Sequence, residues 1–468
     1  IFDAPTPEQL ANAIQTANAA ANAHIITPAG GDDRLLLSYQ QERLWFLEQL
    51  DPAAGAVQQI EGAIRLTGSL DIAALKTALN ALVGRHESLR TSFQTIDGSP
   101  VATIRPANAH GFALETRDVD GLSDAALSEC VAMCLEEPFR IASGPLFRAR
   151  LLSRSGVDHV LILGGHHAAL DGWSVGLISR ELSDLYRQAV TGEAASLPPL
   201  HIQYADYVAW QRSALSSEQL AGAIDWWKAE LSGIPEAIAL PTDRPRSAAM
   251  DHRGGAVPVA IGTDVADRLK KLAAHESVTI FVVLQALFSA LLSRLGAGED
   301  VVIGTAAAGR PSGDLEPLVG FFVNTLALRH KVDELAPFRT HLRATKQVVL
   351  DAFAHQDVPF DKVVEALQPV RSLSHPPVVQ VMLVLQETPE VVLSLPGVAA
   401  QTYDHGRTRA QFELALNLSE TEEGLSGSLS YASRLFEQDT AERIVGMFAS
   451  LAAAVAENPD GLLADFAL

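Results

Sequence analysis

The sequence predicts a mixed α/β fold made of two lobes. Its 468 residues exceed the roughly 100–150 residues of the commonest domains, so a single small core is excluded. Hydrophobic residues make up 48% of the chain and charged residues 19%, which is enough apolar surface for most of it to fold. Runs rich in valine and isoleucine alternate with segments of helical periodicity. Such strands are expected at residues 300–305, 378–385, 413–419 and 425–431.

A strand followed by a helix opens each expected lobe. Residues 63–93 give the strand AIRLTG, a cap within Ser69-Leu70-Asp71 and a helix with leucines at helical spacing. Residues 256–295 repeat this plan with AVPVAIG, a cap at Thr263-Asp264 and two helices. A proline pair and an aromatic run lie between them, near Ala205. We therefore expect a linker segment at 1–30, an N-terminal lobe at 31–205 and a C-terminal lobe at 206–468.

The charge balance disfavours two classes of partner. Lys and Arg total 35 against 56 Asp and Glu, a formal charge of -21, and a field of this sign repels nucleic acids and anionic membranes. The apolar segment at 278–293 is shorter than the roughly 20 residues that span a bilayer, so it predicts a buried core helix. No secretion signal opens this sequence, and we expect a cytoplasmic protein.

No metal or nucleotide site is expected from the sequence. Cys130 and Cys134, the two cysteines of the chain, lie four residues apart in a helical pattern, which is typical of small hydrophobic residues that face a core. His, Cys and carboxylate residues form no cluster with metal-ligand spacing. A glycine-rich phosphate loop is also missing, so neither ATP nor a dinucleotide is expected.

The most informative segment is a histidine pair at the end of a buried strand. Residues 157–165 are mostly apolar, and His166, His167, Asp171 and Gly172 follow before a helix begins. Adjacent residues leaving a strand point to opposite sides, so one histidine faces a cavity and the other is structural. An imidazole that titrates near neutrality can assist an amine or hydroxyl nucleophile. On the pattern alone, the alternative remains that both histidines are structural, with their hydrogen bonds made within the protein.

The string HHAALDG at 166–172 resembles the HHxxxDG signature of nonribosomal peptide synthetase condensation domains, relatives of chloramphenicol acetyltransferase. Other motifs of the family appear in its order, and the last has Ser-His-Pro in place of Ser-Arg-Asn. They are SYQQERLWFLEQL at 38–50, GRHESLRTSF at 84–93, YADYVAW at 204–210, VGFFVNTLALR at 319–329, HQDVPFDKVVEAL at 355–367 and RSLSHPPVVQVML at 371–383. From residue 35 onward the chain is identified as a member of this family.

The resemblance implies two chloramphenicol acetyltransferase-like lobes in a V, with the histidine motif midway along a central tunnel. It implies that His167 is catalytic and that His166 is structural. It also implies that Asp171 is a structural partner of an arginine, either Arg310 or Arg90.

Residues around the motif are implied to shape the tunnel. Gly172 would keep the backbone close to the reacting centre, where a Cβ would crowd the thioester. Ala168 and Ala169 give a smaller and more apolar floor than is usual in the family. Trp173 and Ser174, together with the WFLEQL string, resemble the subtype that accepts an L-configured donor.

The resemblance also implies the partners. Donor and acceptor would arrive on the phosphopantetheine arms of an upstream and a downstream peptidyl carrier domain, beside an adenylation domain, and the domain itself would bind no cofactor or metal. The opening IFDAPTPEQLA resembles the end of a carrier domain. The expected reaction is amide-bond formation in the biosynthesis of a secondary metabolite such as an antibiotic.

Rival functions are separated by particular residues. An epimerization domain would lack the VGFFVNT string, and a heterocyclization domain would have an aspartate in place of His166. A non-catalytic docking module of the same fold, which recruits partners to a carrier, would lose His167. An acyltransferase that uses coenzyme A remains an alternative on fold alone.

Overall fold

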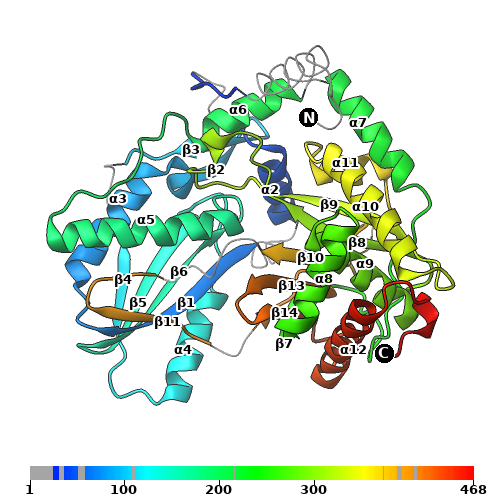
Figure 1. The fold of residues 1–468 in the computed structure, drawn as a ribbon. Helices are drawn as coiled ribbons and strands as arrows, with labels where there is room; N and C mark the ends of the chain where they lie inside the picture. The colour runs from blue at the N-terminus through cyan, green and yellow to red at the C-terminus, as the bar shows by residue number, and fades with distance from the viewer. Residues whose placement is uncertain are drawn as a thin grey trace, which may run out of the picture. The chain divides into compact units, whose positions relative to one another are not determined.

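The computed structural model (Figure 1) describes most of the chain, which divides into two compact units. The described residues are 25–30, 36–50, 58–107, 112–215, 217–370, 372, 374–386, 393–404 and 408–468. The first unit comprises Ile1–Gln219, Ala308–Val323 and Val391–His405, and the second comprises Leu220–Ala307, Asn324–Glu390 and Gly406–Leu468. Most of the expected linker and carrier-like segment, residues 1–24, lies outside the described residues.

This division differs from the single boundary that the sequence suggested near Ala205. Helix α6 (Tyr204–Ala214) belongs to the first unit, because its aromatic side chains pack against the segment Ala308–Val323. Tyr204 contacts the ring of Phe322 edge to face, with ring centroids 4.9 Å apart. An insertion that returns to an earlier unit leaves no mark in local sequence patterns.

The first unit is built on a five-stranded sheet with the order β11-β1-β6-β5-β4. Strands β1, β5, β6 and β11 pair antiparallel, and β4 pairs parallel with β5. The strands of this unit are β1 (Gln59–Gly68), β2 (Thr91–Ile96), β3 (Ser99–Ile104), β4 (Leu114–Asp118), β5 (Phe147–Ser155), β6 (Asp158–His166) and β11 (Val398–Thr402), of which β2 and β3 form a separate two-stranded sheet. Its helices are α2 (Tyr39–Leu50), α3 (Ile72–Arg85), η3 (Glu87–Arg90), α4 (Asp124–Glu136), α5 (Gly172–Thr191), α6 and η5 (Gly313–Leu315).

Helices cover both faces of this sheet. Leu161 of β6 packs in the cluster of α3 and α5, whereas its neighbours Val160 and Ile162 pack in the cluster of α4, as strand alternation requires. Cys130 lies in the α4 cluster with Cys134 packed against it, and both are free thiols, so the sequence interpretation of small core residues is confirmed.

The second unit is built on a seven-stranded sheet with the order β12-β7-β14-β13-β10-β8-β9. Its strands are β7 (Arg253–Gly262), β8 (Asp300–Ala307), β9 (Asn324–Lys331), β10 (Val381–Gln386), β12 (Thr408–Arg409), β13 (Leu414–Thr421) and β14 (Gly424–Ala432). Its helices are α7 (Ser217–Glu230, which begins at the boundary), α8 (Thr263–His275), α9 (Ile280–Leu292), η4 (Ser293–Ala297), α10 (Phe338–Ala354), α11 (Phe360–Leu367), α12 (Gln438–Glu457) and η6 (Leu463–Asp465).

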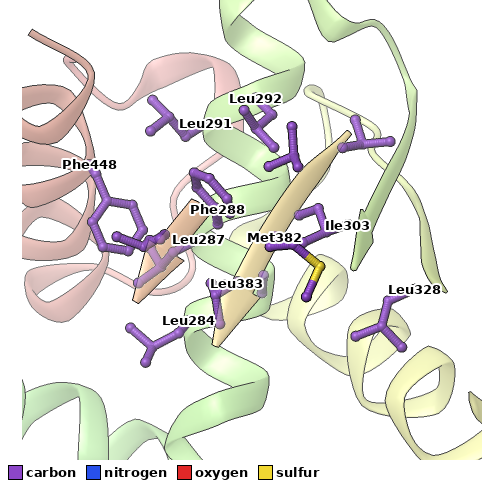
Figure 2. Close-up of a cluster of buried hydrophobic side chains, with 14 of the residues drawn as sticks. Leu284, Leu287, Phe288, Leu291, Leu292, Ile303, Leu328, Met382, Leu383 and Phe448 are labelled. Atoms are coloured by element: carbon purple, nitrogen blue, oxygen red, sulfur yellow. The ribbon is translucent and has the colours of Figure 1, made fainter. Parts of the chain in front are cut away.

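Helix α9 is the centre of the second unit, as the apolar pattern at 278–293 predicted. Its leucines and Phe288 pack against Phe448 of α12 and against β8 and β10 (Figure 2). The stretch Ile280–Ala297 is apolar enough to cross a membrane by composition, but 72% of its residues are buried within the protein. The expected cap of α8 differs, because Gly262 occupies the N-cap position and Thr263 is the first helical residue.

Candidate active site

The histidine pair lies where β6 ends, and the glycines before it are required by close packing. A Cβ on Gly164 would stand 2.1 Å from the Glu61 side chain, and one on Gly165 would stand 2.5 Å from Leu170. His166 is the last residue of β6 and pairs with Gln59 of β1. The strand therefore delivers the two histidines from a tightly packed, central position of the sheet.

His166 points into the protein. Its side chain is 1% exposed, and its Nδ1 accepts a hydrogen bond from the backbone N–H of Ala168 at 3.1 Å. Burial, aided by the neighbouring His167, lowers the pKa of His166 to about 3. A ring that accepts at Nδ1 carries its proton at Nε2, so this contact selects one neutral tautomer. The geometry is that of a structural residue that fixes the turn after β6.

His167 is partly exposed as a residue, whereas its ring nitrogen Nδ1 is buried. Its backbone N–H donates to the carbonyl of Gln58 at 2.8 Å, and its ring lies against Phe321 with centroids 5.4 Å apart. Burial lowers the pKa of His167 to about 4, and the Asp171 carboxylate opposes this shift. At neutral pH the ring is therefore uncharged and able to accept a hydrogen bond.

Asp171 joins the turn after β6 to the segment Ala308–Val323. As the N-cap of α5, its Oδ1 accepts hydrogen bonds from the backbone N–H and the hydroxyl of Ser174, at 2.9 and 2.7 Å. Its Oδ2 accepts from the N–H of Phe322 at 3.0 Å. Arg310 Nη2 lies 3.3 Å from Oδ1, and both side chains of this ion pair are 2% exposed. The carboxylate is thus fully occupied by structural partners.

Arg310 is held on several sides at once. Its Nη1 donates to the carbonyls of Leu315 and Leu318, and its guanidinium lies 3.9 Å from the centroid of the Phe322 ring. Burial lowers its pKa, and Asp171 opposes this shift. Arg90, the other arginine suggested by the sequence, is not the partner: its side chain lies 3.6 Å from Glu87 and donates to the carbonyl of Arg105. These contacts hold Arg90 at the η3 turn.

The residues that the resemblance places along a tunnel are mostly buried in this structure. Ala168 and Ala169 are each 1% exposed and pack in a core cluster with residues such as Phe93. Ser174 is fully buried, and its hydroxyl bonds to both the carbonyl and the N–H of Gly320, at 3.0 and 3.1 Å. Trp173 is the exception, at 37% exposed, with its indole N–H donating to the carbonyl of Glu316.

Gly172 has open space around it. A Cβ built there would meet no atom within 4 Å, and its φ lies outside the left-handed region. Neighbouring residues therefore impose no requirement for glycine, in contrast to Gly164 and Gly165. A bound molecule is the remaining source of a steric limit at this position.

Several residues of the site were not identified from the sequence, although each lies in a quoted motif. Gln41 donates to the carbonyl of Ala168 at 2.8 Å, which ties α2 to the histidine turn. Tyr204 donates to the carbonyl of Phe321 at 2.8 Å. A Cβ on Gly320 would stand 2.1 Å from the Tyr204 ring. The motif strings were the available signal, but they do not state which contacts their residues make.

Comparison with known proteins identifies the family of the chain. The family model described as "Condensation domain" matches residues 32–468. Malpinin synthetase of Mortierella alpina is 39% identical over 95% of this chain, and a linear gramicidin synthase of Brevibacillus parabrevis is 37% identical over 98%. The chain spans only 6% of the length of each of these two relatives.

Solved structures agree with this result. The X-domain from teicoplanin biosynthesis superposes with a TM-score of 0.84 at 29% identity, covering 95% of this chain and all of that one. The first condensation domain of the calcium-dependent antibiotic synthetase gives a TM-score of 0.75 at 21% identity, covering 93% of this chain and 99% of that one, which shows a shared fold. The two-unit α/β architecture with an HHxxxDG turn is therefore that of a known class. The chain belongs to the condensation-domain family of nonribosomal peptide synthetases, the domains that form the peptide bonds of their products.

Proposed function

We propose that this domain joins a donor acyl or peptidyl thioester to the α-amine of an acceptor aminoacyl thioester. The observation that carries the proposal is the intact second histidine: His167 is uncharged, partly accessible and fixed at the end of a central strand. Both substrates would be carried by phosphopantetheine arms of upstream and downstream carrier domains, in a cytoplasmic synthetase that also contains an adenylation domain.

The proposed reaction needs only modest chemical help. The amine nitrogen attacks the thioester carbonyl, a C–N bond forms, the C–S bond breaks, and the amine proton passes to the departing thiolate. A free α-amino group has a pKa of about 7.7–8.0, so a fair fraction of it is already neutral at cytoplasmic pH. Holding the two reactants in line supplies up to roughly 7–11 kcal/mol of the barrier reduction.

We assign His167 a positioning role toward the amine. With its pKa lowered to about 4, the ring is a poor acceptor of a whole proton from an ammonium group but a good acceptor of an N–H hydrogen bond. Asp171 supports this role at a distance, through the α5 cap and Arg310, since its own oxygens are taken up by Ser174 and Phe322.

The test is an assay with two differently loaded carrier domains, read by mass spectrometry of the joined product on the acceptor. His167→Ala should lower the condensation rate by at least about 10² and leave the Tm nearly unchanged. His159→Ala is a matched control, since His159 is a buried histidine at the start of the same strand and bonds to Ser153. Near-full activity of His167→Ala would overturn the assignment.

We further propose that the donor is L-configured. The support is the resemblance of the WFLEQL and DGWS strings to the L-donor subtype. The carrier-like start of the chain lies outside the described residues, so the structure adds nothing to it. Matched L- and D-terminated donors should differ by about 10² in rate in favour of L, and equal rates would refute the subtype.

A docking module is the second candidate, favoured by the similarity to the teicoplanin X-domain, which has been solved in complex with OxyB. The same assay separates the two: carriers that bind without a joined product would indicate docking. Free acyl-coenzyme A that fully replaces the loaded donor carrier would instead indicate a coenzyme A-dependent acyltransferase.

A further inference from the structure

Five polar side chains are buried together in the second unit, away from the histidine motif. Each is at most 4% exposed, and α9 also contributes the neighbouring residues Leu284 and Phe288 to the hydrophobic cluster of this unit (Figure 2). They come from two helices and one strand: Gln285 and Ser289 from α9, His341 and Thr345 from α10, and His330 from β9.

Helices α9 and α10 are antiparallel here, and we call the five buried polar side chains between them and β9 the polar seam. Ser289 Oγ lies 2.9 Å from His341 Nε2, and Ser293 Oγ donates to Glu334 at 3.2 Å. Moving back one turn along α9 from Ser289 and forward one turn along α10 from His341 brings Gln285 opposite Thr345.

His330 of β9 lies beside His341 of α10. Its ring centroid is 6.4 Å from that of His341. It lies on the same face of β9 as the buried residues Leu326 and Leu328, because side chains alternate along a strand. The three elements therefore bring their polar groups to one place between the sheet and the helix pair.

Most of these polar atoms lack a hydrogen-bond partner. The unpaired atoms are the amide nitrogen and oxygen of Gln285, both ring nitrogens of His330 and the hydroxyl of Thr345. They are five of the 14 such side-chain atoms in the described part of the chain, so the deficit is concentrated rather than scattered. A buried donor or acceptor without a hydrogen-bond partner destabilises the folded state by its full desolvation penalty. Native proteins therefore rarely contain several such groups close together.

We propose that this seam is a buried hydration site, occupied by ordered water bonded to Gln285, His330 and Thr345. Water fits because the amide, the imidazole and the hydroxyl each present both donor and acceptor capacity, and water offers both in return. An ion fits poorly, since none of the five side chains is a carboxylate or a permanent cation to compensate its charge. The two nitrogens of His330 are separated across its ring, and a buried water makes about three hydrogen bonds, so about two waters are needed.

The test compares the chain with its Gln285→Met variant, which keeps side-chain length and removes both amide atoms. High-resolution crystal structures should show about two waters within hydrogen-bond distance of the named atoms in the parent and fewer in the variant. Water-oxygen magnetic relaxation dispersion should lose a matching long-lived signal in solution. Condensation activity is not the readout, so failure of the proposed function would leave this test intact.

Gln380→Met is the matched control, because Gln380 is equally buried in the same unit but fully paired, with the N–H of Ile238 and the carbonyl of Pro376. It should lower the Tm and leave the long-lived water signal unchanged. The proposal is overturned if the parent seam is dry and Gln285→Met raises the Tm. A direct Gln285–His330 hydrogen bond, or anomalous scattering from a metal between the rings, would overturn it as well.

Discussion

Asp171→Ala removes four contacts at once, and typical magnitudes can be set against three of them. The cap of α5 at the Ser174 N–H contributes typically about 1 kcal/mol, and the Phe322 N–H left buried without an acceptor costs about 1–3 kcal/mol. The largest effect is on Arg310, since breaking a buried ion pair leaves an uncompensated charge that costs roughly 3–5 kcal/mol. These terms overlap, so we expect a total loss of about 4 kcal/mol.

The loss should be measured by thermal and urea unfolding of the whole chain. For units of this size, 1 kcal/mol lowers the Tm by roughly 2–4 °C, so a loss of about 4 kcal/mol should lower the Tm by roughly 8–16 °C. Asp71→Ala is a matched control, because Asp71 caps α3 through the Ala74 N–H but is exposed and has no ion pair there. Its cost should be only about 1 kcal/mol.

A double variant separates charge from cap. Asp171→Ala combined with Arg310→Met removes the unpaired cation, and much of the lost stability should return. The reasoning is refuted if Asp171→Ala costs no more than Asp71→Ala. A fully stable but inactive Asp171→Ala protein would show instead that Asp171 acts directly on His167.

The remaining predictions concern acid stability, Phe321 and Gly172. Burial lowers the pKa values of His330 and His341 from 6.5 to about 3 and about 4, so below pH 6.5 the unfolded chain binds more protons than the folded one. The free energy of unfolding should therefore fall with acidification, by up to about 1.4 kcal/mol per pH unit for each ring. His341→Gln should reduce that slope in unfolding curves measured between pH 7 and 5. Phe321→Leu removes the ring beside His167 and should lower kcat by roughly 10-fold, since misplacement of a reacting group by about 1 Å costs up to 10² in rate. The Tm should shift by only a few degrees. An unchanged kcat would show that the ring contact is not used. Gly172→Ala should fold with a nearly unchanged Tm, because a Cβ there meets nothing, and slower condensation in that stable protein would locate the thioester beside it.

Local patterns sufficed wherever the decisive interaction is local. The alternation and apolar runs predicted β6, β7, β13 and β14, and the apolar run at 278–293 predicted the core helix α9. Strand geometry alone separated the directions of His166 and His167, because successive side chains leave a strand on opposite faces. The HHxxxDG string and its companion motifs identified the family for the same reason, since they are read from contiguous residues.

Contacts between distant segments were beyond local reading. Both Arg310 and Arg90 were compatible with the sequence as partners of Asp171, and the choice follows from the return of Ala308–Val323 to the first unit. Ala168 was expected near a tunnel from its motif, and only the folded structure shows that it packs in the core cluster with Phe93. A sequence gives the face on which a side chain emerges, not what covers that face.

The same distinction applies to the molecule as a whole. The sequence by itself determined the α/β class, the strand that ends in two histidines and the family, because period-2 and period-3.6 patterns and short motifs are set by neighbours along the chain. Tertiary structure alone decided the Asp171–Arg310 pair, the burial of Ser174 and the contact of Ser289 with His341. Each of these joins elements far apart in sequence, and their proximity depends on packing free energy summed over the whole unit rather than on any local preference.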